Sequence, residues 1–367
     1  WIPSLGINLS FLVDGLSIFF GLVVSVMGIL IFFYGTQYLD SHYGEQNRFY
    51  AYLVLFMGAM LGTVFANNLL LLFVFWELTG LASFLLIGFL YDKEASRLGA
   101  RMALLITVGT GLCMRAGIGL VGLHLDTFSL SQILNAPVSP EAGWATPAVI
   151  LLMLGAFGKS AQFPFHFWLP NAMAAPTPVS AYLHSATMVK LGVFLAARLY
   201  PAFDEVAVWM PLLVGVGLTT MLLGSILATL SNDLKAILAY STVTQLGFLV
   251  GMYGMAAPGV VTYDYLQIMN HVLYKGCLFM IAGIVDHSAG TRDIRQLGGL
   301  ARRMPWTAAA CLVTAASMAG IPGTLGFISK EAMLHELFYR YPELGGWGLY
   351  ALVCILVASV FKVLFSA

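Results

Sequence analysis

Long apolar runs separated by short polar segments dominate the pattern of this chain. A helix that crosses a membrane needs about 20 mostly apolar residues, and eleven runs approach that length. We expect spanning helices over residues 14–38, 50–66, 69–90, 98–123, 148–169, 179–199, 206–230, 234–253, 261–286, 306–330 and 346–365. The pattern therefore predicts an all-α, polytopic transmembrane helix bundle.

The longest connection, residues 124–147, contains Pro137, Pro140 and a Ser-Leu-Ser-Gln-Ile-Leu stretch that predicts a short surface helix. No linker or change in composition divides the chain, so we expect residues 1–367 to form a single transmembrane domain. The chain starts at Trp1 and stops directly after an apolar run. We therefore expect it to be a fragment of a longer protein, without that protein's N- and C-terminal helices.

The composition agrees with a lipid environment. Of 367 residues, 60% are hydrophobic and 9% are charged, whereas soluble domains carry about 25% charged residues. The net charge of zero gives no basic surface for nucleic acid. No phosphate-binding loop or dinucleotide-binding glycine pattern is present, so we expect no cofactor. The cysteines lie alone in apolar runs, which predicts neither a metal site nor disulfides; they are Cys113, Cys277, Cys311 and Cys354.

The basic residues in the loops and near the span ends predict an orientation. If the helices alternate, nine of these residues fall on one side, against only Arg198 and Arg340 on the other. The nine are Arg48, Lys93, Arg97, Arg101, Lys235, Arg292, Arg295, Arg302 and Arg303. Cytoplasmic loops of membrane proteins carry the excess of Lys and Arg. We therefore expect cytoplasmic loops near 40–49, 91–97, 231–235 and 287–305, an external start, and a location in the plasma membrane.

Apart from the basic residues assigned to the two sides, six more lie inside the expected spans, as does Glu77, and each charge there costs at least about 2.5–3.5 kcal/mol. They are Glu77, Arg115, Lys159, Lys190, Lys275, Lys330 and Lys362. Lys362 is near the end of the last span, so snorkelling to the membrane surface explains it. Arg115 could snorkel too, and has no evident partner. The other charges suggest a line of groups that face one another or a watery interior.

Glu77 and Lys159 are the first two members of this line. Glu77 is near the middle of its span, and Lys159 comes five residues before Pro164. A proline inside a helix removes a backbone hydrogen bond, and membrane helices are broken where they line a cavity or are buried in protein. The pair could be a fixed ion pair, with Glu77 only a counter-ion. Alternatively, both groups could gain and lose protons as the distance between them changes.

Four more candidates occupy two later spans. His184 and Lys190 are six residues apart, which on one helix turns them about 120° from each other. His271 and Lys275 are four apart and share a helix face, so an imidazole and an ammonium could exchange a proton there. The histidines have a simpler alternative role: His184 as a satisfied hydrogen bonder, and His271 as a group that orients Lys275.

Lys330 follows a glycine- and proline-rich segment that should break its span about midway, at Gly320, Pro322 and Gly323. Together with the break near Pro164, this gives two broken spans, each with a lysine. Broken helices in corresponding places are typical of transporters built from related halves.

Several motifs carry a resemblance to a known family. They include Trp76-Glu77-Leu78, Gly158 through Pro170, Ala175 through Ser180, and Ser231 through Ala236. The whole chain resembles the antiporter-like subunits of respiratory complex I. It is most similar to the large A subunit of Mrp-type multisubunit Na⁺/H⁺ antiporters, through His184-Ser-Ala-Thr-Met-Val-Lys190, Gly290-Thr-Arg-Asp-Ile294 and Phe327-Ile-Ser-Lys-Glu331.

The resemblance implies a fourteen-helix proton-translocating fold, of which this chain would supply the third to thirteenth helices, with the seventh and twelfth broken. By motif, Glu77 matches the family's glutamate and Lys159 its lysine partner. Lys190, His271 and Lys275 match the central relay, and Lys330 the terminal lysine. His184 matches a histidine near the start of this relay. Partners would be small membrane subunits and a second antiporter-like subunit. Arg115 departs from the apolar residue expected there.

Three functions are open at this point. The first is a proton-carrying subunit of a Na⁺/H⁺ antiporter, which is not an enzyme and which the Mrp-like motifs favour. The second is a proton-pumping subunit of a complex I-like NADH:quinone oxidoreductase. The third is a membrane scaffold, which would have no reason to carry the insertion cost of the buried charges. Buried carboxylates that could bind Na⁺ are scarce, with Glu77 the clearest and Asp14 marginal, so we expect the sodium path to need another subunit or an interface.

Overall fold

The computed structural model describes residues 8–39, 45–255 and 261–366. Within these ranges the chain is helical and has no β-strand, as the apolar pattern predicts. The α-helices are α1 (Gly15–Tyr38), α2 (Gln46–Phe65), α3 (Leu69–Ile87), α4 (Glu94–Leu125), α5 (Leu130–Leu134), α6 (Ala145–Lys159), α7 (Trp168–Asn171), α8 (Thr177–Ser185), α9 (Leu191–Phe203), α10 (Trp209–Leu230), α11 (Leu234–Met255), α12 (Val261–Ala289), α13 (Leu300–Arg303), α14 (Pro305–Ala319), α15 (Leu325–Leu344) and α16 (Gly346–Ser366). Four 3₁₀ helices join them: η2 (Phe165–Phe167), η3 (Ala172–Ala174), η4 (Met188–Lys190) and η5 (Ile294–Gln296).

The apolar runs correspond to spanning helices. In the described part of the chain, nine helical stretches are long and apolar enough to cross a membrane, with α8 and α9 together forming one of them. The shorter apolar helices α6 and α14 supply the other two predicted spans, which are the two expected to be broken. The predicted short helix in the long connection is α5. The chain is thus a multi-pass membrane protein.

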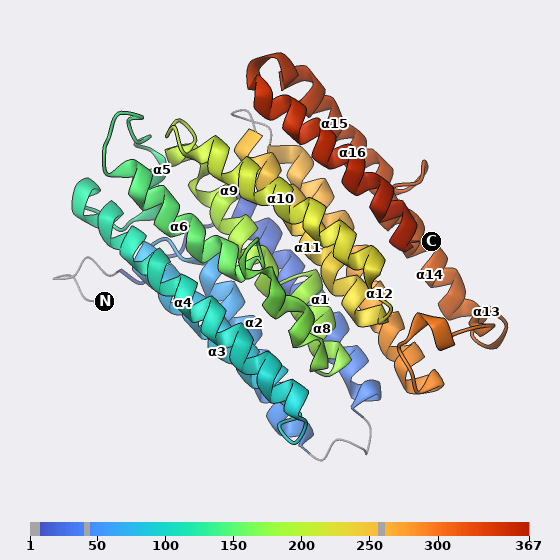
Figure 1. Ribbon diagram of the computed structural model, residues 1–367. Coiled ribbons are helices and arrows are strands. Elements are labelled where there is room, and N and C mark those ends of the chain that lie inside the picture. The colour runs from blue at the N-terminus through green and yellow to red at the C-terminus, as the bar shows by residue number, and fades with distance from the viewer. Residues whose placement is uncertain (1–7, 40–44, 256–260, 367) are drawn as a thin grey trace.

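The spans lie side by side, nearly parallel or antiparallel to one another (Figure 1). The α3–α4 pair occupies one flank and the α15–α16 pair the opposite flank (Figure 1). Between them, α12 packs against α8, α14 and α15, and α10 packs against α11 and α16. Every residue of α8 is buried. The middle helices are therefore shielded from lipid and can carry polar groups.

Glycines let α10 and α11 approach closely. A Cβ atom at Gly217 of α10 would lie 2.7 Å from the Gly247 carbonyl oxygen of α11. A Cβ atom at Gly247 would lie 2.5 Å from the backbone nitrogen of Met221. Small residues at such contacts are typical of packed membrane helices.

Both expected helix breaks are present, but their limits differ from the prediction. Helix α6 ends at Lys159, so the break expected near Pro164 begins several residues before that proline. Helix α14 ends at Ala319, and the next residue, Gly320, has a positive φ of 85° that suits a glycine. The predicted span end at residue 330 is wrong, because α15 continues to Leu344. Lys330 therefore belongs to the second half of a broken span.

A third break was not expected. Helix α8 ends at Ser185, and the chain re-enters a helix only through η4 and α9. Between them, the Thr187 hydroxyl donates to the Tyr182 carbonyl at 2.7 Å, in place of the helical backbone pattern. The predicted angle of about 120° between His184 and Lys190 therefore does not apply, because no continuous helix joins them.

Candidate functional site

Glu77 and Lys159 lie close in space but do not form an ion pair. Lys159 is fully buried at the end of α6, and its ammonium donates to the Trp76 carbonyl at 2.9 Å. It also lies 5.4 Å from the centre of the Trp76 ring, a cation–π distance. The Glu77 carboxylate instead points to Gly111 of α4, where a Cβ atom would collide with Oε1. Among the described residues Glu77 Oε1 has no hydrogen-bond partner, so the structure shows this pair open.

The segment after Lys159 reaches the segment that holds Lys190. The Ser160 hydroxyl donates to the Val189 carbonyl at 2.5 Å. Ser160 follows Lys159 and Val189 precedes Lys190, so this bond joins the two segments that carry these lysines. The Trp168 indole donates to the Gly158 carbonyl at 2.9 Å. The indole thus satisfies one of the carbonyls that the end of α6 leaves without helical partners.

His184 lies within the same region, fully buried near the end of α8. Its ring centre is 6.2 Å from that of Trp168 and 6.3 Å from that of Phe279. Neither ring nitrogen has a hydrogen-bond partner in the described part of the chain. The alternative of a histidine satisfied by protein hydrogen bonds therefore does not describe this geometry.

Lys190 and His271 make the closest contact within the line of charges. The Lys190 ammonium is 2.7 Å from His271 Nδ1, and both residues are fully buried. Lys190 also donates to the carbonyl of Ser185, the last residue of α8. The negative end of the helix dipole and a freed carbonyl thus stabilise a cation at the unexpected break. A distance of 2.7 Å is suitable for direct proton transfer.

The structure shows no direct hydrogen bond between His271 and Lys275 among the described residues, although the two share a face of α12. The Lys275 ammonium instead donates to the Ser241 hydroxyl and, at 3.2 Å, to the Leu238 carbonyl, both on α11. His271 Nε2 is buried without a partner in the described residues. The alternative role for His271, orienting Lys275, is not supported by these contacts.

Lys330 also stabilises a helix end. Its ammonium donates to the Ala319 carbonyl at 2.6 Å, at the C-terminus of α14. A Cβ atom at Gly320 would lie 2.8 Å from this ammonium, so the glycine leaves room for it. Lys190 and Lys330 thus use the same arrangement, in which a lysine binds the carbonyl end of a broken helix.

The sequence matches two models of known protein families. One, described as "NADH:quinone oxidoreductase/Mrp antiporter, TM", matches residues 66–361. The other, described as "NADH-Ubiquinone oxidoreductase (complex I), chain 5 N-terminus", matches residues 1–50. The chain belongs to the NADH:quinone oxidoreductase/Mrp antiporter family. The resemblance inferred from its motifs is confirmed.

Several curated relatives of this chain are named antiporter subunits. The chain is 47% identical over 385 aligned positions to the A subunit of a Na(+)/H(+) antiporter from Alkalihalophilus pseudofirmus, and 46% identical over 384 to the protein of the same name in Bacillus subtilis. Each alignment covers 100% of this chain and 48% of the relative. A chain in the "Structure of Mrp complex from Dietzia sp. DQ12-45-1b" matches with a TM-score of 0.93 and 40% identity, over 100% of this chain and 40% of that one. The chain spans about half the length of the curated relatives it matches.

The prediction that Lys362 snorkels to the membrane surface is wrong. Lys362 does not snorkel: its side chain is buried, and its ammonium donates to the Gln245 side-chain oxygen at 3.2 Å. Gln245 is near the midpoint of α11, so Lys362 lies deep in the bundle and away from the helix ends.

Two further basic residues, expected in loops or at span ends, are buried. Lys235 lies in the first turn of α11 and donates to the Ala175 carbonyl at 3.3 Å. Arg198 lies inside α9 and binds the Asp14 carboxylate with both terminal nitrogens, one of them at 3.0 Å. Asp14 also caps α1 through Ser17. Its oxygens are therefore engaged, which weakens Asp14 as a sodium ligand. A buried basic residue near a span end gives no sequence signal that separates it from a loop residue.

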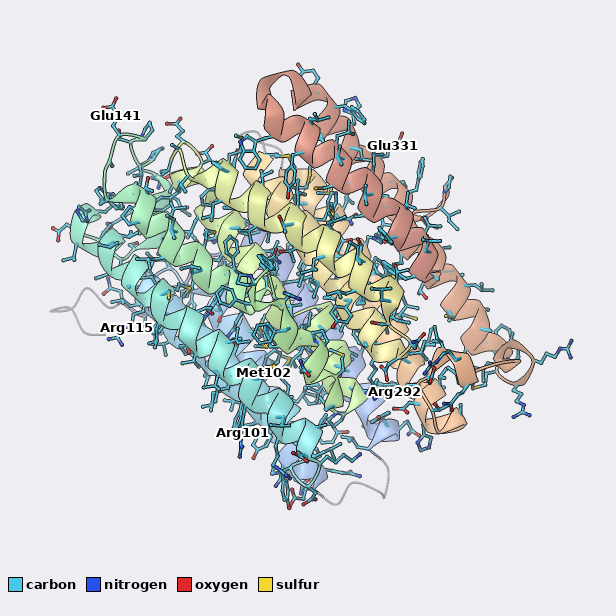
Figure 2. The ribbon with its side chains drawn as sticks, viewed as in Figure 1. Arg101, Met102, Arg115, Glu141, Arg292 and Glu331 are labelled. Carbon is cyan, nitrogen blue, oxygen red and sulfur yellow. The ribbon has the colours of Figure 1, made fainter. Side chains whose placement is uncertain are left out.

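Arg115 lies on the outer surface of α4 and is exposed, as is Arg101 on the same helix. Figure 2 shows both side chains pointing away from the bundle. Arg115 is about 15 Å along the helix from Leu125. It does not belong to the line of buried charges, and its snorkelling to the membrane surface stays a prediction.

Proposed function

We propose that this chain is the proton-carrying part of the A subunit of an Mrp-type Na⁺/H⁺ antiporter. Protons would move near mid-membrane along one line of side chains: Glu77, Lys159, His184, Lys190, His271, Lys275 and Lys330. The chain would act as a single translocating domain of a secondary transporter and would not be an enzyme. It would lie in the plasma membrane with the loops near 40–49, 91–97, 231–235 and 287–305 in the cytoplasm.

The contact between Lys190 and His271 carries this proposal. A buried ammonium 2.7 Å from an imidazole nitrogen can transfer its proton without moving any helix. An imidazole can accept a proton at Nδ1 and release one from Nε2, so His271 would pass a proton from one side of its ring to the other.

The open Glu77–Lys159 pair supplies a place for control. The Lys159 ammonium can remain on the Trp76 carbonyl or turn to the neighbouring Glu77 carboxylate. When the ion pair closes, the carboxylate favours the protonated ammonium; when it opens, burial without a counter-charge favours release of that proton. We infer that this change sets when a proton enters the rest of the line.

The partners follow from the same proposal. We infer that the chain works with small membrane subunits and a second antiporter-like subunit in the lipid bilayer, and exchanges H⁺ for Na⁺ as part of that complex. We infer that the sodium path lies in another subunit; in support, Arg198 and Ser17 already engage the carboxylate of Asp14, one of the few near the spans. The alternative, a subunit of a complex I-like NADH:quinone oxidoreductase, is less favoured because the named relatives with full coverage of this chain are antiporter subunits.

The test uses the full-length protein in its complete complex. Na⁺/H⁺ exchange is measured in everted membrane vesicles with a pH-sensitive dye, for the wild type and Lys159→Ala. Lys93→Ala, a change at an exposed lysine, is the control. Loss of exchange in Lys159→Ala, with assembly intact on a native gel, is the expected result. Unchanged exchange would mean that the buried charges are structural and that protons cross elsewhere.

A further inference from the structure

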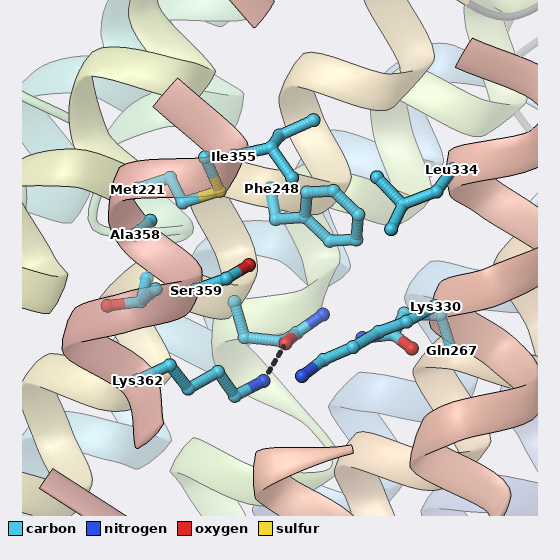
Figure 3. Close-up of a pocket in the computed structure, with 11 residues that line it drawn as sticks. Met221, Phe248, Gln267, Lys330, Leu334, Ile355, Ala358, Ser359 and Lys362 are labelled. Atoms are coloured by element: carbon cyan, nitrogen blue, oxygen red, sulfur yellow. Dashed lines mark hydrogen bonds between the residues drawn. The ribbon is translucent and has the colours of Figure 1, made fainter. Parts of the chain in front are cut away.

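A small cavity lies between α11, α12, α15 and α16, near the flank opposite to Glu77. Its volume is about 40 Å³, which exceeds the roughly 10–15 Å³ that one water molecule needs. Figure 3 shows the ammonium ends of Lys330 and Lys362 turned toward one another across it. Gln245 and Gln267 also line this Lys330–Lys362 cavity.

Contacts on α11 and α12 connect Lys362 to the line of charges. The ammonium groups of Lys275 and Lys362 lie 5.6 and 5.8 Å from the centre of the same Tyr274 ring. Lys275 binds Ser241, and Lys362 binds Gln245, one helical turn further along α11. Lys362 therefore lies between Lys275 and Lys330, in a position that a proton leaving Lys275 can reach.

The cavity has cations and donors but no acid. No carboxylate among the described residues lines it. The amide nitrogens of Gln245 and Gln267 are buried and have no acceptor in the described part of the chain. An ammonium can only donate, so the Gln245 side-chain oxygen faces Lys362. The Gln245 amide nitrogen therefore points away from the Lys362 ammonium. Two protonated lysines here would repel each other without a counter-charge, whereas a neutral lysine amine would accept from the free amide donors.

We propose that Lys330 and Lys362 share a single proton, and that Lys362 passes protons from Lys275 to this pair. When a proton moves from the Lys275 ammonium to the Lys362 amine, the new charge repels the proton on Lys330. Lys330 then releases it to water in the cavity, which has room for more than one molecule, and becomes the neutral member of the pair. The step conserves protons: one is received from Lys275 and one is given up by Lys330. The inference rests on the proposed proton transport and adds a final transfer step to it.

The test compares Lys362→Met and Lys362→Arg in the complete complex, with exchange measured across a range of pH. Both variants should lower exchange at least about tenfold, because Met cannot hold a proton and Arg cannot release one. Met removes the charge that expels the Lys330 proton, so the pH of half-maximal exchange should rise by about one unit. Arg places a permanent charge there, so that pH should fall. A purely structural role for Lys362 would not move the two profiles in opposite directions.

The groups that face Lys362 are Lys330 on α15, Lys275 and Tyr274 on α12, and Gln245 on α11. Gln245→Glu offers a second, isosteric variant. A carboxylate in the cavity would let both lysines stay charged, so exchange should again fall at least about tenfold. This variant decides the question if neither Lys362 variant assembles. Exchange within about twofold of wild type in Gln245→Glu would then overturn the inference.

Two controls separate the possible failures. Lys93→Met and Lys93→Arg change an exposed lysine and should leave the pH profile in place. Suppose that Lys159→Met abolishes exchange, but that the Lys362 variants either stay within about twofold of wild type or both shift the pH profile in the same direction. The shared-proton pair is then wrong, and the proposed function stands. If Lys159→Met also retains exchange, the proposed function fails and the inference fails with it.

Discussion

The contact between Lys190 and His271 leads to a prediction that separates proton transfer from simple hydrogen bonding. In His271→Asn, the side-chain amide can place an oxygen near the position of Nδ1 and still accept from Lys190, but it cannot carry a proton. General acid–base catalysis by a positioned side chain contributes typically about 10²–10⁴-fold. We therefore expect exchange to fall at least about 100-fold, which corresponds to about 2.7 kcal/mol of barrier.

Stability should change much less in this variant. A hydrogen bond to a charged group is worth about 1.5–3 kcal/mol, and His271→Asn keeps it. His271→Leu removes it and leaves the buried Lys190 ammonium with the Ser185 carbonyl as its one partner among the described residues. We expect His271→Leu to lower the stability of the purified complex by roughly that amount, measured by thermal unfolding, and His271→Asn to lower it by less than about 1 kcal/mol.

The assay is Na⁺/H⁺ exchange in everted vesicles, with assembly checked on a native gel. His335→Asn is the matched control, because His335 is exposed on α15. If His271→Asn exchanges within about twofold of wild type, His271 only holds Lys190 in place, and the reasoning from the 2.7 Å contact is refuted.

Three further predictions concern stability. Partial burial acts to raise the pKa of Asp14, but the hydrogen bonds from Arg198 and Ser17 outweigh it and lower the pKa to about 2. Because the Asp14 side chain is 39% exposed, solvent screens its pair with Arg198, which should contribute only about 1 kcal/mol of stability above about pH 4. Thermal unfolding should show this contribution lost as the pH falls from about 4 to 2, and absent in Asp14→Asn. Gly247→Leu should prevent α10 and α11 from packing and abolish assembly on a native gel, whereas Gly109→Leu, where a Cβ atom meets nothing within 4 Å, should assemble. Gly320→Ala should lower stability by about 1–2 kcal/mol because the positive φ strains alanine; an unchanged unfolding temperature would contradict this.

The sequence predicted the spans well because hydropathy alone determines which segments can cross a membrane. Breaks marked by proline or glycine were also predicted, at Pro164 and Gly320. The break after Ser185 was not, because neither residue type marks it. It is stabilised by the Thr187 hydroxyl and by the Lys190 ammonium, which bind carbonyls at the end of α8. Contacts of this kind depend on the folded chain.

The contacts of the site were harder to predict than its members. Spacing shows which residues share a face of one helix, but it does not show which helix lies opposite. His271 was therefore paired with Lys275 on its own helix, although Lys190 is its partner. Lys362 was predicted to snorkel because it is near the end of its span in the sequence. Its actual depth depends on where α16 packs against α11, which the sequence distance from a helix end does not show.

The central claim is that one continuous path joins Lys159 to Lys330 across the bundle. The most direct test measures Na⁺-driven proton movement in liposomes that contain the purified complete complex, for Lys159→Met, Lys330→Met and the double variant. Steps in series predict that each single variant abolishes proton movement and that the double variant is no worse. If each single variant keeps a substantial part of the activity and only the double variant loses it, protons have two separate routes and the single path is wrong.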